Sequence, residues 1–231
     1  MNIKKSISEL SYFERMLWIS SVTIIIIFSL FIGIDYIISP TASVIGATAL
    51  IFLSKGNVLG QILIVIFSIL YGIISYSFHY YGEMITYLCM TAPIAILAVI
   101  SWLRHPYNGN TREVEVNRIS KSEMIIIFIV SLIVTFIFYF ILNAFNTSSL
   151  ILSTLSVTTS FLASYLTFRR SEFYALAYAA NDIVLIILWI IATVSDYKYL
   201  SMTICFCKFF INDIYGFISW RKIKNRQIKC S

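Results

Sequence analysis

Long runs of apolar residues, each about as long as a membrane is thick, limit this chain to one broad class of fold. A helix needs roughly 20 mostly apolar residues to cross the hydrocarbon core of a bilayer. Such runs fill most of the 231 residues, at about 17–37, 41–54, 58–79, 84–103, 122–145, 149–168, 172–195 and 197–220. Only 12% of the residues are charged, about half the share of a typical soluble domain. The sequence therefore predicts an all-α integral membrane protein with eight transmembrane helices.

The positions of the Lys and Arg residues predict the orientation in the membrane. Of the 17 basic residues, 15 fall in segments on the side of the two termini, whereas Lys198 falls on the opposite side and Lys208 lies within the last run. Lys and Arg are enriched in cytoplasmic loops. We therefore expect a multi-pass protein of the cell inner (plasma) membrane with both termini cytoplasmic. The net charge of +6 comes from these loops and does not indicate nucleic-acid binding.

The tripeptide Ile-Ser-Trp occurs twice, at 100–102 and 218–220, and each copy closes a run on the cytoplasmic side. The three runs before each copy have similar lengths, which indicates two three-helix repeats that face the same way. A further crossing has to connect them, because three crossings leave the chain on the opposite side. The run at 122–145 is apolar all round and suits that linker role.

The predicted organisation is one N-terminal helix plus a three-one-three arrangement. Its segments are a cytoplasmic N-terminus with a peripheral transmembrane helix (1–40), a first three-helix repeat (41–103), a cytoplasmic loop and linker helix (104–145), a second three-helix repeat (146–222) and a basic cytoplasmic tail (223–231).

Polar side chains at helical spacing form three stripes inside the predicted membrane region, where polar groups serve function or pair helices. The stripes are Gln61, Ser68, Ser75 and His79 in the third run; Tyr174, Tyr178, Asn181 or Asp182, Leu185 and Trp189 in the seventh; and Lys208, Asn212, Tyr215 and Ser219 in the eighth. Transporters built from repeats bind substrate where the copies meet. We therefore expect the stripes to converge on one cavity, with Asn212 and Tyr215 as ligand contacts. For Tyr174 and Tyr178, helix packing and ligand contact both stay open.

Asp182 and Lys208 both fall near the middle of the membrane and are predicted to form a buried ion pair. An unpaired charge at that depth would cost several kcal/mol. Asp213 lies about 100° around the helix from Asn212 and is an alternative partner. The ladder Ser156, Ser160 and Ser164 is interpreted as a small-residue packing seam.

The sequence contains no pattern that predicts catalysis. It has no G-x-x-x-x-G-K-[ST] loop, no evident nucleophile–base pair and no C-x-x-C spacing among its four cysteines. His79 and His105 fall on opposite sides of the membrane and cannot share a metal. We therefore expect no enzyme, no catalytic or metal-binding residues and no cofactor. A non-transporting membrane scaffold, whose polar stripes bind only neighbouring helices, is the alternative class.

Several segments resemble PnuC-type vitamin transporters. The segments GATALIFLSKGNVLGQ, LYGIISY, YYGE and ISW are similar to the first half of that family, and SFLASYLTFRRSEFYALAYAAND with FINDIYGFISW resembles the second half, so the resemblance covers about 41–222. It implies a fold related to the SWEET sugar transporters and facilitated diffusion of nicotinamide riboside. A cytoplasmic kinase would then phosphorylate the solute and feed NAD synthesis. Relatives carry thiamine, riboflavin or deoxyribonucleosides, which are the alternative substrates.

The resemblance also implies a substrate site. Carriers of nicotinamide riboside show a W-x-x-W pair after the acidic residue that opens the seventh helix, whereas FYALAY follows Glu172 here. The predicted substrate-binding residues are Gln61, Tyr174, Tyr178, Asn181, Asn212 and Tyr215. A flat cationic ring suits aromatic faces, and ribose hydroxyls suit amides and hydroxyls. The expected partners are this solute and the lipid bilayer, with no nucleic acid and with a homo-oligomer left open.

Overall fold

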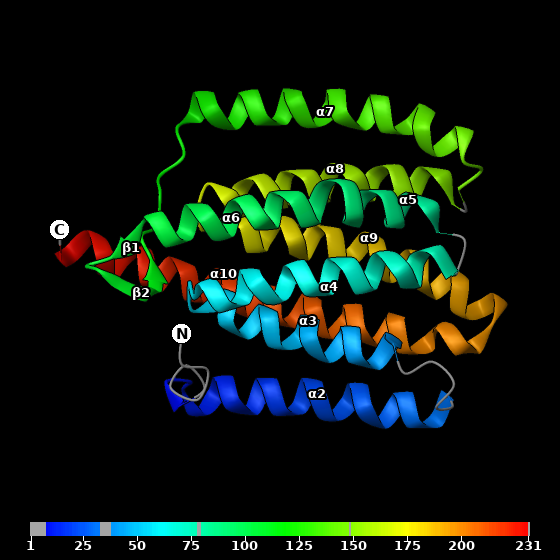
Figure 1. Cartoon of the computed structure of the whole chain (residues 1–231), viewed down its shortest axis with the longest axis horizontal. Coiled ribbons are helices and arrows are strands. Elements are labelled where there is room, and N and C mark those ends of the chain that lie inside the picture. Colours follow the sequence, from blue (N-terminus) through cyan, green and yellow to red (C-terminus); the bar gives the residue numbers. More distant parts are fainter. Residues whose placement is uncertain (1–7, 33–37, 78–79, 148, 231) are drawn as a thin grey trace.

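The computed structural model describes residues 8–32, 38–77, 80–147 and 149–230, and in it long helices run side by side along the longest axis (Figure 1). The helical elements are α2 (Tyr12–Ile32), α3 (Ile38–Ser54), α4 (Val58–Ser77), α5 (Tyr81–Ile85), η2 (Thr86–Thr91), α6 (Ala92–Arg104), α7 (Lys121–Ala144), α8 (Leu150–Phe168), α9 (Tyr174–Ser195), η3 (Tyr197–Tyr199) and α10 (Leu200–Cys230). Helix α10 runs on through most of the predicted tail at 223–231.

The described helices have the length and composition of a multi-pass membrane protein. Six helical segments in this part of the chain are long and apolar enough to cross a bilayer, namely α4, the α5–η2–α6 segment, α7, α8, α9 and α10, and α3 is a shorter apolar helix. Eight crossings and the predicted domain boundaries stay predictions.

Helices α7 and α2 lie on opposite flanks of the bundle (Figure 1). Helix α7 packs on α8, whereas α2 contacts both α3 and α10. The buried side chains of α7 are Ile127, Ser131 and Leu142, so most of its apolar surface faces outward, as lipid contact allows.

The turn after α3 and the turn after α8 have the same geometry. Gly56 (φ 67°) and Arg170 (φ 58°) both adopt the left-handed conformation that ends a helix. Their backbone N–H groups donate to the third carbonyl back, those of Leu53 (2.8 Å) and Thr167 (3.0 Å). Arg170 is not a glycine, so this backbone is adopted against its ordinary preference.

The two Ile-Ser-Trp copies hold these same turns in a crossed pattern. Trp102 at the end of α6 donates its indole N–H to the carbonyl of Thr167 at 3.0 Å, and Trp220 on α10 donates to the carbonyl of Leu53 at 2.7 Å. Both indoles are almost fully buried, with ring centroids 5.5 Å apart. Each Trp therefore ties the third helix of one predicted repeat to the first helix of the other.

Acidic residues of α2 and α7 bind the basic residue of each turn. Lys55 lies 3.3 Å from Glu14, and Arg169 lies 2.6 Å from Glu123. The hydrogen bond to Glu123 raises the pKa of the Arg169 guanidinium above its ordinary value. The two outer helices are therefore joined to the bundle at the same end and by the same kind of contact.

Pro93 disturbs the helix between α5 and α6. Proline has no N–H to donate, and its ring clashes with the carbonyl four residues earlier. The turns before it form the π-helix η2, which brings Tyr87 and Thr91 to the interior of the bundle. Such π-bulges often occur at functional sites.

A short hairpin, β1 (Pro106–Tyr107) and β2 (Asn110–Val114), follows α6 and was not predicted from the helix count. Asn108 (φ 47°) and Gly109 (φ 73°) form its turn. The hairpin contacts the end of α10, where Gln227 donates to the carbonyl of Val114 at 3.1 Å.

Candidate functional site

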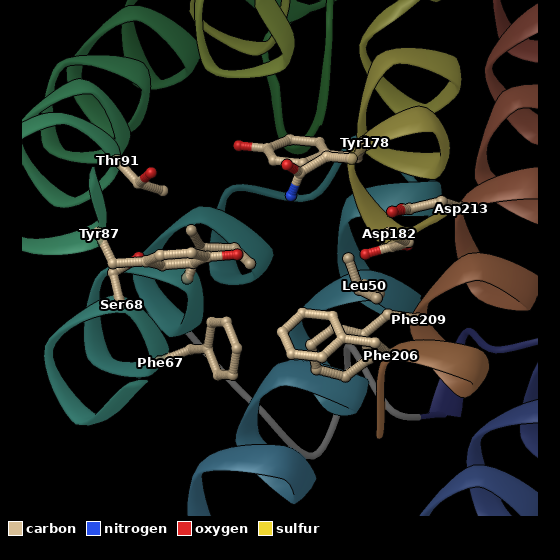
Figure 2. Close-up of a pocket in the computed structure, with 12 residues that line it drawn as sticks. Leu50, Phe67, Ser68, Tyr87, Thr91, Tyr178, Asp182, Phe206, Phe209 and Asp213 are labelled. Atoms are coloured by element: carbon tan, nitrogen blue, oxygen red, sulfur yellow. The ribbon is translucent and has the colours of Figure 1, made fainter. Parts of the chain in front are cut away.

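A cavity lies between the helices of the two predicted repeats. Helices α3, α4 and η2 line one part of it, and α9 and α10 line the other (Figure 2). The free volume of the cavity is about 30 Å³, room for about one water molecule. It is smaller than the roughly 300–1,000 Å³ of a site with a bound small molecule, so the helices around it have to move apart to admit a solute.

Two carboxyl groups form one wall of the cavity. Asp182 on α9 and Asp213 on α10 lie side by side (Figure 2) and are 3% and 4% exposed. Two carboxyl groups buried this close together repel each other when both are ionised. The second oxygen of Asp182, Oδ2, is buried and has no hydrogen-bond partner.

Aromatic rings and two hydroxyl groups form the wall opposite the carboxyl pair (Figure 2). The ring of Phe67 lies 6.0 Å from that of Tyr87 and 5.4 Å from that of Phe209. The hydroxyl groups of Ser68 and Thr91 are buried and have no hydrogen-bond partner. Buried polar groups are normally satisfied, so these atoms mark a surface built for polar contact with something other than the protein.

Asn181 and Tyr178 on α9 also line the cavity and are held by α8. The side-chain oxygen of Asn181 accepts hydrogen bonds from Thr159 (2.8 Å), Ser160 (3.0 Å) and Ser156 (3.3 Å). Three hydroxyls on one oxygen fix the amide in one orientation. Ser156 and Ser160 of the serine ladder therefore orient the side-chain amide of Asn181. This hydrogen bonding goes beyond the close helix packing that the ladder was interpreted to serve.

Gln61 and Tyr174 lie beside the cavity. Gln61 is buried, its side-chain nitrogen has no partner, and it lines a narrow void that also contacts Tyr178 and is too small for a water molecule. Tyr174 is 1% exposed, and its ring centroid lies 4.8 Å from that of Trp220. Of the predicted substrate-binding residues, Tyr178 and Asn181 thus line the cavity. Gln61 lines the void beside it, and Tyr174 packs between helices.

Asn212 and Tyr215 face α2 instead. Tyr215 donates its hydroxyl proton to Glu14 at 2.9 Å, and its ring centroid lies 5.2 Å from that of Phe13. Asn212 donates to the Lys208 carbonyl at 2.9 Å, and its amide nitrogen lies 3.4 Å from the hydroxyl of Ser21. Neither residue lines the cavity. The predicted grip on a central solute is therefore not the arrangement found.

The predicted pair of Asp182 and Lys208 is not formed. Asp182 instead lies beside Asp213, five residues beyond Lys208 on α10 (Figure 2). Lys208 is half-buried and makes no ion pair with any described residue. The neighbour of Asp182 is therefore Asp213, a second carboxyl group, and not the lysine that was predicted. His79 of the third-run stripe lies outside the described residues.

The sequence reasoning missed three contributors to this region. Tyr87 and Thr91 reach the cavity because the helix is π-helical there. Glu83 is fully buried next to it, and one of its carboxyl oxygens lies 3.4 Å from the hydroxyl oxygen of Ser156. Pro93 in the fourth run was the available signal for the change in helix geometry.

An apolar helical bundle with a polar and aromatic cavity between two sets of helices is typical of a membrane transporter. The sequence model of the nicotinamide mononucleotide transporter family matches residues 36–222. The chain belongs to this family, and the resemblance to PnuC-type transporters is confirmed.

Two relatives carry related names. The nicotinamide riboside transporter PnuC of Neisseria mucosa is 26% identical over 197 residues, which are 83% of this chain and 74% of that protein. The crystal structure of a vitamin B3 transporter PnuC matches with a TM-score of 0.86 and 23% identity, over 97% of both chains. At that identity the likeness shows the fold.

Proposed function

We propose that this protein carries nicotinamide riboside into the cell by facilitated diffusion, in a cycle in which the cavity opens to one side of the membrane at a time. The observation that carries the proposal is the cavity itself, with a carboxyl pair on one wall and aromatic rings on the other. The pyridinium ring of nicotinamide riboside is flat and positively charged. Both walls attract such a ring, the carboxyl pair through its charge and the aromatic faces through their quadrupole.

The charge of the cavity favours the riboside over the phosphorylated mononucleotide. The described residues that line the cavity include Asp182 and Asp213 but no Lys or Arg. A phosphate group is usually bound by Arg, Lys or backbone N–H groups, and here it would face carboxyl groups of the same sign. The riboside offers hydroxyl groups instead, which suit Asn181 and the unpartnered hydroxyls of Ser68 and Thr91.

The proposed membrane arrangement is two same-facing repeats with both termini in the cytoplasm. The crossed hydrogen bonds of Trp102 and Trp220 and the matched turns at Gly56 and Arg170 support two copies of one unit. On this arrangement the hairpin and the end of α10 lie on the cytoplasmic side. The void beside Gln61 lies near the start of α4, at that same end, and would extend the cavity toward the cytoplasm.

A cytoplasmic kinase completes the proposed route. Facilitated diffusion stops when the two concentrations are equal. Phosphorylation inside the cell keeps the riboside concentration low and yields a mononucleotide, which the acidic cavity does not favour. The product is thereby kept for NAD synthesis.

Uptake by vesicles that contain the purified protein tests this proposal. We expect saturable uptake of labelled nicotinamide riboside without an imposed ion gradient, and competition by unlabelled nicotinamide riboside but not by nicotinamide mononucleotide. Thiamine, riboflavin and deoxyribonucleosides serve as the alternative solutes. Uptake no faster than in protein-free vesicles for every compound would favour the scaffold alternative.

A further inference from the structure

The residues that lead from the end of β2 toward α7 join the two matched turns of the bundle. Val114 donates its backbone N–H to the carbonyl of Gly56, and Asn117 donates its backbone N–H to the carbonyl of Arg170, each at 3.0 Å. In both turns the acceptor is the residue with the left-handed backbone. We call residues 113–117 the strap, because they connect the end of α3 to the end of α8.

The two turns lie on opposite sides of the bundle. Helix α3 packs on α4 and α10, α8 packs on α6 and α9, and the pairs α4–α6 and α9–α10 complete a ring. In this ring of six helices, α3 and α8 are opposite each other. The cavity lies inside the ring, and the strap crosses the ring at the end where the hairpin and the end of α10 lie (Figure 1).

The narrow void beside the cavity leads toward this same end. Tyr178 lines both the cavity and the void, whose other walls are residues of α4 and α6 on one side and Ser164 and Thr167 of α8 on the other. A solute can pass this void, which is too small for a water molecule, only if the two predicted repeats move apart here. Because α3 packs on α4 and α8 packs on α9, that movement also separates Gly56 from Arg170.

The length of the strap limits this separation. Three residues lead from Val114 to Asn117, and an extended chain spans at most 3.3–3.6 Å per residue, so their two backbone nitrogens can lie at most about 11 Å apart. The turns cannot separate beyond that limit while both hydrogen bonds to the strap are intact. Opening at this end therefore has to break one of the two bonds.

Gln227 of α10 holds the strap from a third side. Its side chain is buried, donates to the carbonyl of Val114 at 3.1 Å and accepts from the backbone N–H of Val116 at 2.9 Å. It also donates to the carboxylate of Glu113 at 2.9 Å. The amide thus pairs with the backbone as a neighbouring strand would, and it ties the strap to the last helix of the second predicted repeat.

We propose that the strap keeps the cavity closed to the cytoplasm, and that it has to release Gly56, Arg170 or Gln227 before a solute passes. This inference concerns the opening of the cavity and does not depend on which solute is carried. It takes the cytoplasmic side from the proposed membrane arrangement.

The reaction of a cysteine in the void measures how often this end of the bundle opens. In a chain whose four cysteines are replaced by alanine, Ser164→Cys places a thiol in the wall of the void. Membrane vesicles of known orientation are treated with a membrane-impermeant maleimide on one side at a time, without added solute. A second chain carries Ser131→Cys instead, at a fully buried position on α7 outside the void, and reports general loosening of the bundle.

Two changes weaken the strap in different ways. Gln227→Leu removes the side-chain hydrogen bonds from α10 to the strap. Insertion of Gly-Gly between Val116 and Asn117 keeps every attachment but raises the reach of the strap to about 18 Å. We expect each change to speed labelling at position 164 from the cytoplasmic side about fivefold or more, the effect of one lost hydrogen bond on an equilibrium. Asn225→Leu, which changes an exposed amide in the same turn of α10, should leave the labelling rate unchanged.

The expected result is faster labelling at position 164, but not at position 131, in both strap variants. The inference is overturned if either variant folds, as thermal unfolding shows, and labels no faster than the parent chain. It is also overturned if position 131 is accelerated equally, or if labelling is faster only from the outer side. Uptake of nicotinamide riboside by the same vesicles is measured separately. Its absence would overturn the proposed function and leave the strap in place, because the labelling uses no solute.

Discussion

Gly46 on α3 leaves space for an aromatic ring of the cavity, and its replacement by alanine should damage both packing and ligand binding. A Cβ at this position would lie 2.3 Å from Cζ of Phe209 and 3.0 Å from Cδ2 of Phe67. Carbon atoms pack at about 3.5–4.0 Å. The Phe209 ring therefore has to retreat by more than about 1 Å.

The available space beside Phe209 is the cavity, because the ring also packs against Phe67 (5.4 Å) and Phe206 (5.5 Å). Overpacking of this kind costs about 1–3 kcal/mol, which lowers the melting temperature of a chain of this size by roughly 2–10 °C. We expect Gly46→Ala to show this loss in thermal unfolding, together with weaker binding of nicotinamide riboside in calorimetry.

Two further variants make the measurement specific. Gly216→Ala is the matched control, because its Cβ would meet its nearest neighbour, Ala175, at 3.4 Å, an ordinary contact. Adding Phe209→Leu to Gly46→Ala removes the ring that clashes and should restore stability. The reasoning is refuted if Gly46→Ala keeps both the melting temperature and the affinity of the wild type.

Three further predictions concern other parts of the molecule. Tyr215→Phe removes the hydrogen bond to Glu14 and should lower the melting temperature. The KM for uptake should stay within about twofold of the wild type, because Tyr215 lies outside the cavity. A large rise in KM would show that Tyr215 contacts the solute after all. Asn181→Ala removes the acceptor of three hydroxyls, worth about 0.6 kcal/mol each, and should also abolish saturable uptake; vesicle transport and thermal unfolding check both parts. Gly60→Ala would place a Cβ 2.6 Å from the backbone nitrogen of Leu53, which cannot move independently, so we expect a loss of about 3 kcal/mol or more and aggregation on size-exclusion chromatography.

The positions of the helices could be predicted from the sequence because the apolar runs are long and separated by polar segments. The runs at 58–79 and 122–145 match α4 and α7 within two residues at each end. The hairpin was missed although Asn108-Gly109 is the favoured pair for a tight hairpin turn. A search for transmembrane runs alone does not consider a strand pair in the loop between two of them.

The candidate site could be predicted only in part, because helical periodicity identifies a buried face but not the neighbour that covers it. Helix α10 is buried against α2 on one side and against α3 and α9 on others. The stripe with Asn212 and Tyr215 meets α2, whereas Asp213, about 100° further around, meets the cavity. Asp213, which the sequence suggested only as an alternative ion-pair partner, is thus a residue of α10 that reaches the cavity.

The hydrogen bonding of Tyr215 differs from that of the polar residues in the cavity wall. The hydroxyl of Tyr215 donates to Glu14, so its polar group is already satisfied within the protein. Ser68, Thr91 and Asp182 each keep a buried oxygen without a partner, and all three line the same cavity. Asn212 also keeps a buried oxygen without a partner, but it lies outside the cavity. A ligand in the cavity would therefore remove the penalty of unpaired atoms at Ser68, Thr91 and Asp182 only.

The two outer helices contact the bundle in different ways. Helix α7, predicted to connect the repeats, packs on α8 and exposes most of its surface, as suits a helix that is apolar all round. Helix α2, predicted to be peripheral, lies on the opposite flank, and its Glu14 binds both Lys55 at the end of α3 and Tyr215 on α10, which belong to different predicted repeats. If the cavity opens by a movement of α3 against α10, Glu14 has to release either Lys55 or Tyr215, or α2 has to move with both helices. Helix α2 is therefore placed to hold the two halves together at the end of the bundle where α3 finishes.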